Sequence, residues 1–314
     1  MSDKLLKLKL RIKMPFVKKE FIVKEKTKAF LFLMEEMGYT QKEAQRLISR
    51  GRLEVNGKVM KHTAGFFEGT VSFICFEGKS RGLRPVFETQ EFAVYDKPSG
   101  VLVHPQNRNT AYSMIDEAHA AFGRDANITH RIDQETSGLL LISKDKTAER
   151  SLKMLFENRE IQKSYLALVH GEFPDKLEVD EPLLRREDEE AIVRMVVKVD
   201  STGKASQTSF KRLCYYPELD MSLVECYPLT GRQHQIRVHL FHVKHPIVGD
   251  PIYGQTEIDT ARFLDREISK EERIEKSGAS RLMLHANELC FTHGSQYCIR
   301  SKDKFSTDPL SFLD

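Results

Sequence analysis

A short polar segment near the middle of the chain carries the residues best suited to chemistry. Its sequence is His130-Arg131-Ile132-Asp133-Gln134-Glu135-Thr136-Ser137-Gly138, followed by the apolar residues 139–142. A carboxylate placed after a histidine and an arginine, just before a Thr-Ser-Gly turn and a strand-like run, is typical of a functional group at a strand end. Asp133 is therefore the candidate reactive residue. The alternative is structural: Asp133 caps the turn, and His130 and Arg131 are solvated neighbours.

Two later segments supply candidate partners for this carboxylate. Residues 163–169 have a buried-strand pattern that begins with Lys163 and Tyr165, although a strand tyrosine is more often a core residue. In residues 229–239, the pair Thr230 and Gln233 predicts a capping box, which places Arg232 in the first turn of a helix. An arginine there opposes the helix macrodipole unless an anion lies nearby, and we predict that Asp133 is that anion.

The sequence gives no reason to expect a metal site or a disulfide framework. Four histidines have ligand-like spacings, but no set of carboxylates or cysteines accompanies them: His234, His239, His242 and His245. The five cysteines are odd in number and contain no Cys-x-x-Cys pair, so we expect reduced core residues: Cys75, Cys214, Cys226, Cys290 and Cys298.

Length and composition bound the class of protein. The 314 residues are 40% hydrophobic, enough for a substantial core and for roughly two domains of about 150 residues each. No apolar stretch approaches the ~20 residues of a membrane span, and the N-terminus alternates Lys with Leu instead of building a signal-peptide core. We expect a cytoplasmic protein that does not associate with membranes.

Charge is unevenly distributed along the chain. Residues 1–61 contain 16 Lys and Arg against 7 Asp and Glu, a net charge of +9, whereas the whole chain carries only +3. A basic N-terminal part on a body of net −6 indicates a module that meets a polyanion such as RNA or DNA. The alternative is an ordinary solvated basic surface.

Local signals predict the structure of this module. Residues 30–37 form an apolar helix, and Thr40-Gln41-Lys42-Glu43 is a capping box for a second helix that ends at Gly51. Residues 53–59 predict a hairpin about Asn56-Gly57. Two helices, a hairpin and the sequence Arg-Leu-Ile-Ser-Arg-Gly-Arg-Leu-Glu-Val-Asn-Gly resemble, over about residues 20–78, the small RNA-binding domain named after ribosomal protein S-four. The resemblance implies RNA contacts from Lys42, Arg46, Arg50 and Arg52.

Residues 77–85, rich in Gly, Lys and Arg, have the composition of a linker, and six motifs follow it in order. They begin at Phe92-Ala93-Val94-Tyr95-Asp96-Lys97-Pro98-Ser99-Gly100, continue through the Asp133 segment, Lys163-Ser164-Tyr165 and Thr230-Gly231-Arg232-Gln233-His234, and end at Gly249-Asp250-Pro251-Ile252-Tyr253-Gly254 and Leu282-Met283-Leu284-His285-Ala286. Together they resemble the RluA-type enzymes that isomerise uridine to pseudouridine, over about residues 88–293. Two charged stretches between the motifs, 172–193 and 258–277, are expected to be surface loops and an exposed helix, and the second is an alternative RNA contact.

The resemblance implies an α+β fold with a mixed, mostly antiparallel central sheet and flanking helices, preceded by the helix-helix-hairpin domain. We place the RNA-binding domain at 1–78, the linker at 79–86 and the catalytic domain at 87–314. Between Asp145 and Asn158 we predict a helix capped by that aspartate, with Ala148 and Leu152 on its apolar face.

The resemblance also implies a mechanism without cofactor or metal. Asp133 attacks the ribose anomeric carbon or uracil C6, or stabilises a glycal-type intermediate, and the sequence leaves these routes open. Arg232 is expected to keep Asp133 ionised, and Tyr165 to stack on the flipped base. The alternative role for Tyr165 is a proton shuttle at the ribose, for which an unperturbed pKa near 10 makes it a poor base. Arg131 fills the place that the base leaves, and the remaining predicted substrate contacts are His130, Lys163 and Leu229.

The expected partner is structured RNA, with large-subunit ribosomal RNA first and transfer RNA as the alternative, and the protein is expected to be a monomer. Two competing classes make different predictions. A non-catalytic RNA-binding or ribosome assembly factor predicts loss of Asp133, Tyr165 or Arg232, and all three are present. A metal-dependent phosphoesterase requires a second carboxylate at suitable spacing, which the sequence lacks.

Overall fold

The computed structural model describes residues 15–185 and 196–313. The chain divides into two compact units, which are described separately. The first contains the N-terminal residues through Lys79 together with residues 105–112, and the second contains residues 80–104 and everything from Ser113 onward. Residues 105–112, which were predicted to belong to the catalytic domain, thus group with the N-terminal unit.

The first unit is a four-stranded antiparallel sheet with two helices. Its elements are β1 (Phe16–Lys28), α1 (Ala29–Met37), α2 (Gln41–Ser49), β2 (Leu53–Val55), β3 (Lys58–Met60) and β4 (Phe66–Phe76), and the sheet order is β1-β4-β2-β3. The long pair β1 and β4 was not predicted. Residues of both helices and of β2 and β4 share one core, which includes Phe32, Leu33, Ile48, Val71 and Phe73.

The local predictions for this unit are confirmed. The Thr40 hydroxyl accepts a hydrogen bond from the Glu43 amide, and the Glu43 carboxylate accepts one from the Thr40 amide at 3.0 Å, so the capping box is present. Helix α2 is followed by Gly51 at φ 67°, where a side chain would be strained. Asn56 and Gly57 both have positive φ, as a two-residue hairpin loop of this kind requires.

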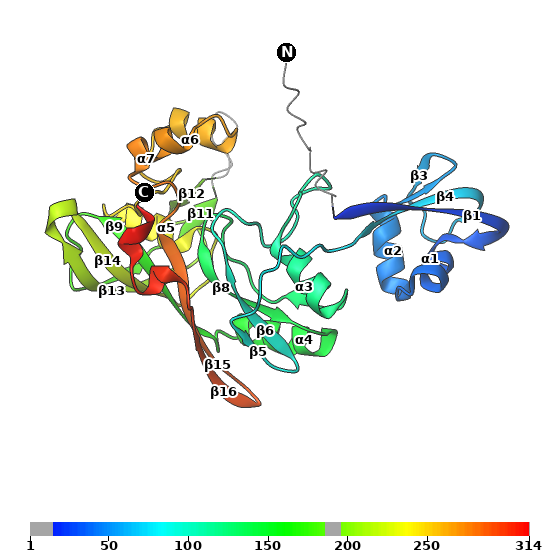
Figure 1. The fold of residues 1–314 in the computed structure, drawn as a ribbon, viewed down its shortest axis with the longest axis horizontal. Coiled ribbons are helices and arrows are strands. Elements are labelled where there is room, and N and C mark those ends of the chain that lie inside the picture. The colour runs from blue at the N-terminus through cyan, green and yellow to red at the C-terminus, as the bar shows by residue number, and fades with distance from the viewer. Residues whose placement is uncertain (1–14, 186–195, 314) are drawn as a thin grey trace, which may run out of the picture. The chain divides into compact units, whose positions relative to one another are not determined.

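The second unit is built on a ten-stranded sheet (Figure 1), of order β10-β13-β14-β9-β15-β8-β6-β5, with β16 paired to β15 and β7 to β8. Its strands are β5 (Phe87–Glu88), β6 (Phe92–Lys97), β7 (Asn127–Ile128), β8 (Ser137–Ser143), β9 (Gln162–His170), β10 (Lys176–Asp180), β13 (Gln207–Tyr216), β14 (Met221–Pro228), β15 (Leu284–His293) and β16 (Ser295–Arg300). Every pairing is antiparallel except that of β15 with β8. The predicted α+β class with a mixed, mostly antiparallel sheet is confirmed.

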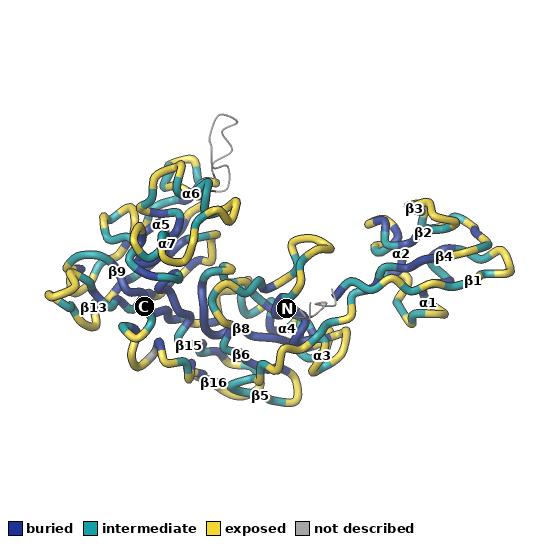
Figure 2. The backbone as a smooth tube through the Cα atoms, turned by 45° about the horizontal axis from the view of Figure 1, so that its top comes forward, coloured by how far each residue is buried: buried dark blue, intermediate teal, exposed yellow. Residues whose placement is uncertain are grey.

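Helices and short turns flank this sheet. They are α3 (Met114–Phe122), α4 (Lys146–Glu157), α5 (Gln235–His242), α6 (Glu257–Leu264), α7 (Lys270–Ser277) and the 3-10 turns Pro217–Leu219, Lys304–Ser306 and Pro309–Phe312. Two further strands, β11 (Leu183–Arg185) and β12 (Val197–Val199), pair with each other and do not join the main sheet. In Figure 2 the strands β8, β9 and β15 are largely dark blue, the colour of buried residues, and their side chains form much of the core of this unit. Within the described ranges, no helix is both long enough and apolar enough to span a bilayer.

The α4 prediction is confirmed, because the Asp145 carboxylate accepts hydrogen bonds from the amides of Thr147 and Ala148, and the helix ends at Glu157. The prediction for the two charged stretches is only partly correct. Residues 172–185 contain β10 and β11, and the rest of that stretch lies outside the described residues; residues 258–277 fall on α6 and α7, two helices instead of one.

The prediction of five reduced core cysteines is wrong. Cys290 and Cys298 face each other in the register of β15 and β16, with Cα atoms 4.1 Å apart, and form a disulfide. Cys214 is exposed, whereas Cys75 and Cys226 are free and buried as expected. The pairing was not predicted because it depends on a hairpin that turns at Gly294, for which the sequence gave no recognised signal.

Candidate active site

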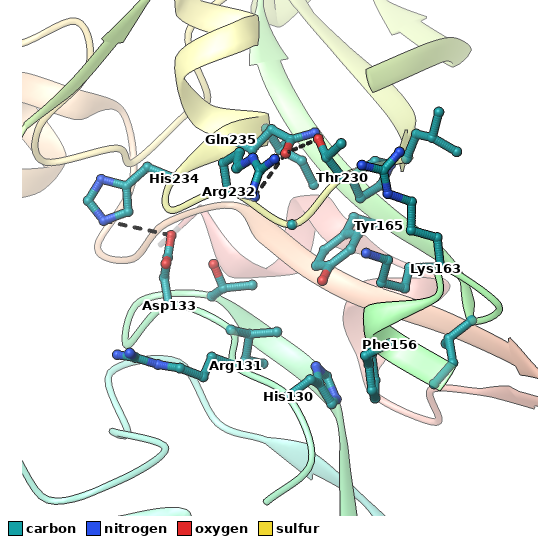
Figure 3. A pocket seen from close by; sticks show the side chains of 18 of the residues that line it. His130, Arg131, Asp133, Phe156, Lys163, Tyr165, Thr230, Arg232, His234 and Gln235 are labelled. Carbon is teal, nitrogen blue, oxygen red and sulfur yellow. Dashed lines mark hydrogen bonds and ion pairs between the residues drawn. The ribbon is translucent and has the colours of Figure 1, made fainter. Parts of the chain in front are cut away.

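A cavity of about 510 Å³ opens at the ends of β8, β9 and β14 and at the start of α5. Its lining includes the three residues predicted to be catalytic, Asp133, Tyr165 and Arg232, and also Arg237. The residues predicted to contact substrate in the second unit line it as well: His130, Arg131, Lys163 and Leu229. Three motifs that lie far apart in the sequence therefore meet at one site (Figure 3).

Asp133 lies in the loop that precedes β8, and its backbone is held by the turn after β6. The Gly100 amide and the buried Lys97 ammonium both donate to the Gln134 carbonyl, at 2.9 and 2.8 Å. The Ser99 hydroxyl donates to the Glu135 carbonyl at 2.6 Å. Burial lowers the pKa of Lys97 to about 7. The Pro-Ser-Gly motif thus fixes the backbone that carries the carboxylate.

A glycine sets the other end of this loop. Gly138 has φ 104°, and a Cβ atom there would lie 2.3 Å from the Ala286 carbonyl oxygen. Only glycine fits this close approach of β8 to β15. The Thr-Ser-Gly turn of the motif is therefore required for the strand pairing that places Asp133 at the cavity.

The arginine that pairs with Asp133 is Arg237, so the predicted pair with Arg232 is wrong. Arg237 Nη1 lies 3.4 Å from Asp133 Oδ2. The same guanidinium binds both oxygens of Asp250, each at 2.7 Å, and is almost fully buried. Burial alone would lower the pKa of Arg237, but the attraction and hydrogen bonds of Asp250, with a further contribution from Asp133, leave it raised. Arg237 is a permanent cation beside Asp133.

The predicted Asp133–Arg232 pair was wrong because α5 begins later in the chain than predicted. The Thr230 hydroxyl and the Arg232 amide both donate to the Gln235 side chain, at 2.7 and 3.0 Å, so Gln233 forms no capping box. His234 has φ 55°, and α5 begins only at Gln235. Arg232 is exposed, with Nε donating to the Ala205 carbonyl. The first turn of α5 does contain an arginine that meets an anion, but it is Arg237.

Tyr165 lies on β9 with 9% of its surface exposed. Burial, then the negative charge of Asp133, raises its pKa. The phenol is therefore neutral at physiological pH and is a poor general base, whereas its ring in the cavity beside Lys163 suits stacking (Figure 3). Burial and the nearby Arg159 lower the pKa of Lys163.

His130 forms part of the cavity wall. Its Nε2 accepts a hydrogen bond from the Leu141 amide at 3.0 Å, and its ring stacks on Phe156 with centroids 4.5 Å apart. Burial, then Lys163, lowers its pKa to about 3, so the ring is neutral. Arg131 and Leu229 are exposed, and Arg131 extends away from Asp133 (Figure 3).

The four histidines considered for metal binding do not gather at one point. His234 contacts the Tyr253 hydroxyl, His239 the Thr208 hydroxyl, and His245 the His170 carbonyl. Within residues 15–185 and 196–313, no group of three potential ligands has the arrangement of a metal site.

The basic residues of the N-terminal unit that were predicted to contact RNA lie on and after α2. Lys42, Arg46 and Arg50 are exposed, and Arg52 stacks on Phe16 with its guanidinium 4.4 Å from the ring centre. Burial, then the positive charges of Arg108 and Arg50, lowers the pKa of Arg52. Arg108, which was not predicted to take part, donates to the Gly51 carbonyl at 3.0 Å within this unit. No short-range signal in the sequence joins residue 108 to this cluster.

Comparisons of the sequence and of the structure with known proteins all find RNA pseudouridine synthases. The family model described as "RNA pseudouridylate synthase" matches residues 91–242. An uncharacterized RNA pseudouridine synthase of Helicobacter pylori (strain ATCC 700392 / 26695) is 37% identical over 289 residues, which cover 92% of this chain and 94% of that protein. Ribosomal large subunit pseudouridine synthase C of Buchnera aphidicola subsp. Baizongia pistaciae (strain Bp) is 35% identical over 231 residues, 73% and 67% of the two chains. The solved structure of human RNA Pseudouridylate Synthase Domain Containing 1 is similar at 27% identity and a TM-score of 0.56, covering 74% and 87%.

Proposed function

The chain belongs to the family of RluA-type RNA pseudouridine synthases, and from this membership we propose that Asp133 is the residue that acts on the target uridine. The observation that supports this role is the Asp133 carboxylate at the cavity, 3.4 Å from a buried arginine and beside a buried neutral tyrosine. A preorganised charge of this kind, held by packing instead of by solvent, is what stabilises developing charge in a transition state.

The reaction requires few chemical groups. The N1–C1′ bond of uridine breaks, a C5–C1′ bond forms, C5 loses a proton and N1 gains one, so the change is an isomerisation. Asp133 serves as the nucleophile at the anomeric carbon or at C6, or stabilises a glycal-type intermediate. Arg237 presents a positive charge to the carboxylate, and that charge is held in place by Asp250 independently of substrate.

Substrate binding follows from the cavity lining. The extruded uracil stacks on Tyr165, and the flanking phosphates are bound by the basic side chains of Arg159, Lys163 and Arg232, which line the cavity. Extrusion of a base from a stem costs a few kcal/mol, which Arg131 offsets in part by filling the vacated place. His130 acts through the cavity wall, since its ring nitrogen already binds the Leu141 amide.

The N-terminal unit supplies affinity for RNA. We assign residues 1–78 to an S-four-type domain, 79–86 to a linker and 87–314 to the catalytic domain, except that residues 105–112 group with the N-terminal unit. Lys42, Arg46, Arg50 and Arg52 bind phosphates, and Arg108 adds to the same cluster. The Buchnera relative is named for the large ribosomal subunit, and large-subunit ribosomal RNA is the target we propose.

The test is to map pseudouridines in total RNA from cells with the gene, without it, and with an Asp133→Asn copy. The proposal expects at least one ribosomal RNA site to be lost without the gene and not to return with the Asn copy. Loss at transfer RNA sites alone would correct the target. Restoration by the Asn copy would remove Asp133 from the chemistry, and an unchanged map would favour the non-catalytic class.

A further inference from the structure

His234 lies between the proposed reactive carboxylate and a buried tyrosine. Its Nε2 is 3.9 Å from Asp133 Oδ2, and its Nδ1 is 2.9 Å from the Tyr253 hydroxyl (Figure 3 shows the contact with Asp133). The ring packs edge-on against Tyr253, with centroids 5.7 Å apart. The imidazole is therefore held by the Tyr253 hydroxyl and ring, and its Nε2 faces Asp133 at a distance longer than a hydrogen bond.

The contacts of Tyr253 determine which imidazole nitrogen carries the proton. The Val197 amide donates to the Tyr253 hydroxyl oxygen at 3.1 Å, so that oxygen already accepts. The hydroxyl proton of a buried tyrosine needs an acceptor, and within the described ranges His234 Nδ1 is the acceptor at hydrogen-bond distance. Nδ1 then carries no proton, and Nε2–H points toward Asp133.

The imidazole stays neutral in this position. Burial, then the positive charge of Arg237, lowers the pKa of His234 to about 4, although Asp133 and Asp250 act in the opposite direction. At physiological pH the ring has one proton only, and the Tyr253 contact assigns it to Nε2. The group that faces Asp133 is thus a neutral N–H donor.

The backbone of His234 indicates that its side chain has a role. A non-glycine residue at φ 55° is uncommon and costs about 1 kcal/mol or more, whereas glycine or asparagine adopts this conformation more readily. The side chain makes no capping hydrogen bond to α5, so helix capping does not account for a histidine there. Its contacts are with Tyr253 and Asp133.

Both donors near the Asp133 carboxylate approach the same oxygen. Arg237 Nη1 is 3.4 Å and His234 Nε2 is 3.9 Å from Oδ2, and among the described residues neither makes a hydrogen bond or ion pair with Oδ1. We propose that His234, held in one tautomer by Tyr253, is a positioning residue that fixes Oδ2 with Arg237 and leaves Oδ1 as the oxygen presented to the uridine. This inference rests on the proposed role of Asp133.

The first experiment measures kcat and KM by tritium release from transcribed large-subunit ribosomal RNA that carries tritium at uridine C5. For His234→Ala we expect kcat to fall by about 10-fold or more, with KM changed less than about 2-fold, because orientation matters in the chemical step and not in RNA binding. His234→Gln, which can return an N–H near the same place, should regain part of kcat. His242→Ala, on the exposed end of the same helix, is the matched control and should behave as wild type.

The second experiment separates positioning from folding. Tyr253→Phe should lower kcat about 3- to 10-fold alone and have no further effect in the His234→Ala background, because Tyr253 acts through His234. Thermal melting of each variant shows whether it folds. Independent, multiplying effects of the two changes, or wild-type kcat for folded His234→Ala, would overturn the inference. Tritium release by wild type, abolished by Asp133→Asn, keeps the proposed function separate from this result.

Discussion

Arg237 Nη1 lies 3.4 Å from Asp133 Oδ2, although the two residues are 104 positions apart in the chain. The same guanidinium is bound by the buried Asp250 through two contacts of 2.7 Å. Asp250 therefore holds the arginine in place before substrate arrives, and Asp133 meets a charge whose position is already fixed.

Asp133→Asn should abolish pseudouridine formation and leave RNA affinity within a few-fold of wild type. The change removes the negative charge but retains the size of the side chain, and most RNA affinity comes from phosphate contacts that it does not touch. Tritium release and filter binding with the same transcript measure the two quantities. Turnover above background would contradict the role of Asp133.

Arg237→Ala should reduce both activity and stability. Removing one partner of a buried ion pair typically costs about 3 to 5 kcal/mol, because the remaining charge, here Asp250, is left buried without compensation. Urea unfolding measures the decrease in stability, and tritium release at a temperature where the variant is folded measures kcat.

Arg232→Ala is the matched control for Arg237→Ala. Arg232 is exposed and contacts the Ala205 carbonyl, so its removal should change the free energy of unfolding by no more than about 0.5 kcal/mol. As an RNA-binding residue at the cavity it should affect KM, which the substitution should raise more than it lowers kcat. If Arg232→Ala abolished kcat and Arg237→Ala did not, the assignment of the Asp133 partner would be reversed.

Stability should fall as the solution becomes acidic, and His130 should contribute to the fall. The pKa of His130 is lowered from an unfolded value near 6.5 to about 3. Between these two pH values the imidazole is protonated in the unfolded chain but not in the folded chain. The contribution of neutral His130 to the free energy of unfolding is constant above pH 6.5. It decreases progressively between pH 6.5 and about pH 3 and does not change further below that. His130→Gln, which does not titrate, should show a smaller loss of stability between pH 7 and 5 in urea unfolding. An equal loss in both proteins would contradict the assignment.

The basic cluster of the N-terminal unit should control affinity and not chemistry. We expect Ala substitutions at Lys42, Arg46 and Arg50 to weaken RNA binding and to make its salt dependence shallower, by roughly 0.7 to 0.9 log units for each phosphate that is no longer neutralised. Substitutions are preferable to deletion, because residues 105–112 group with this unit and would be left without their partners. At saturating RNA, kcat should match wild type. An unchanged salt slope would mean that these charges are only a solvated surface.

Elements whose signals are short in range could be predicted from the sequence. The capping box at Thr40, the hairpin at Asn56-Gly57 and the Asp145 cap all depend on residues within a few positions of one another, and the structure has each of them. The candidate carboxylate was identified in the same way, since its motif is contiguous. Gly138 shows why the motif is so constrained, because its position admits no Cβ beside Ala286.

The groups that surround that carboxylate became known only from the folded chain. The macrodipole argument predicted that Arg232 lies in the first turn of α5 beside Asp133, but the start of the helix depends on the positive φ of His234 and on the Gln235 side chain that binds the preceding loop. These place Arg237, instead of Arg232, beside Asp133. The Cys290–Cys298 pair and the contact of Arg108 with Gly51 likewise depend on a strand register and on a loop position. A one-dimensional pattern indicates which side chains are available, whereas their distances are set by packing among segments that lie far apart in the chain.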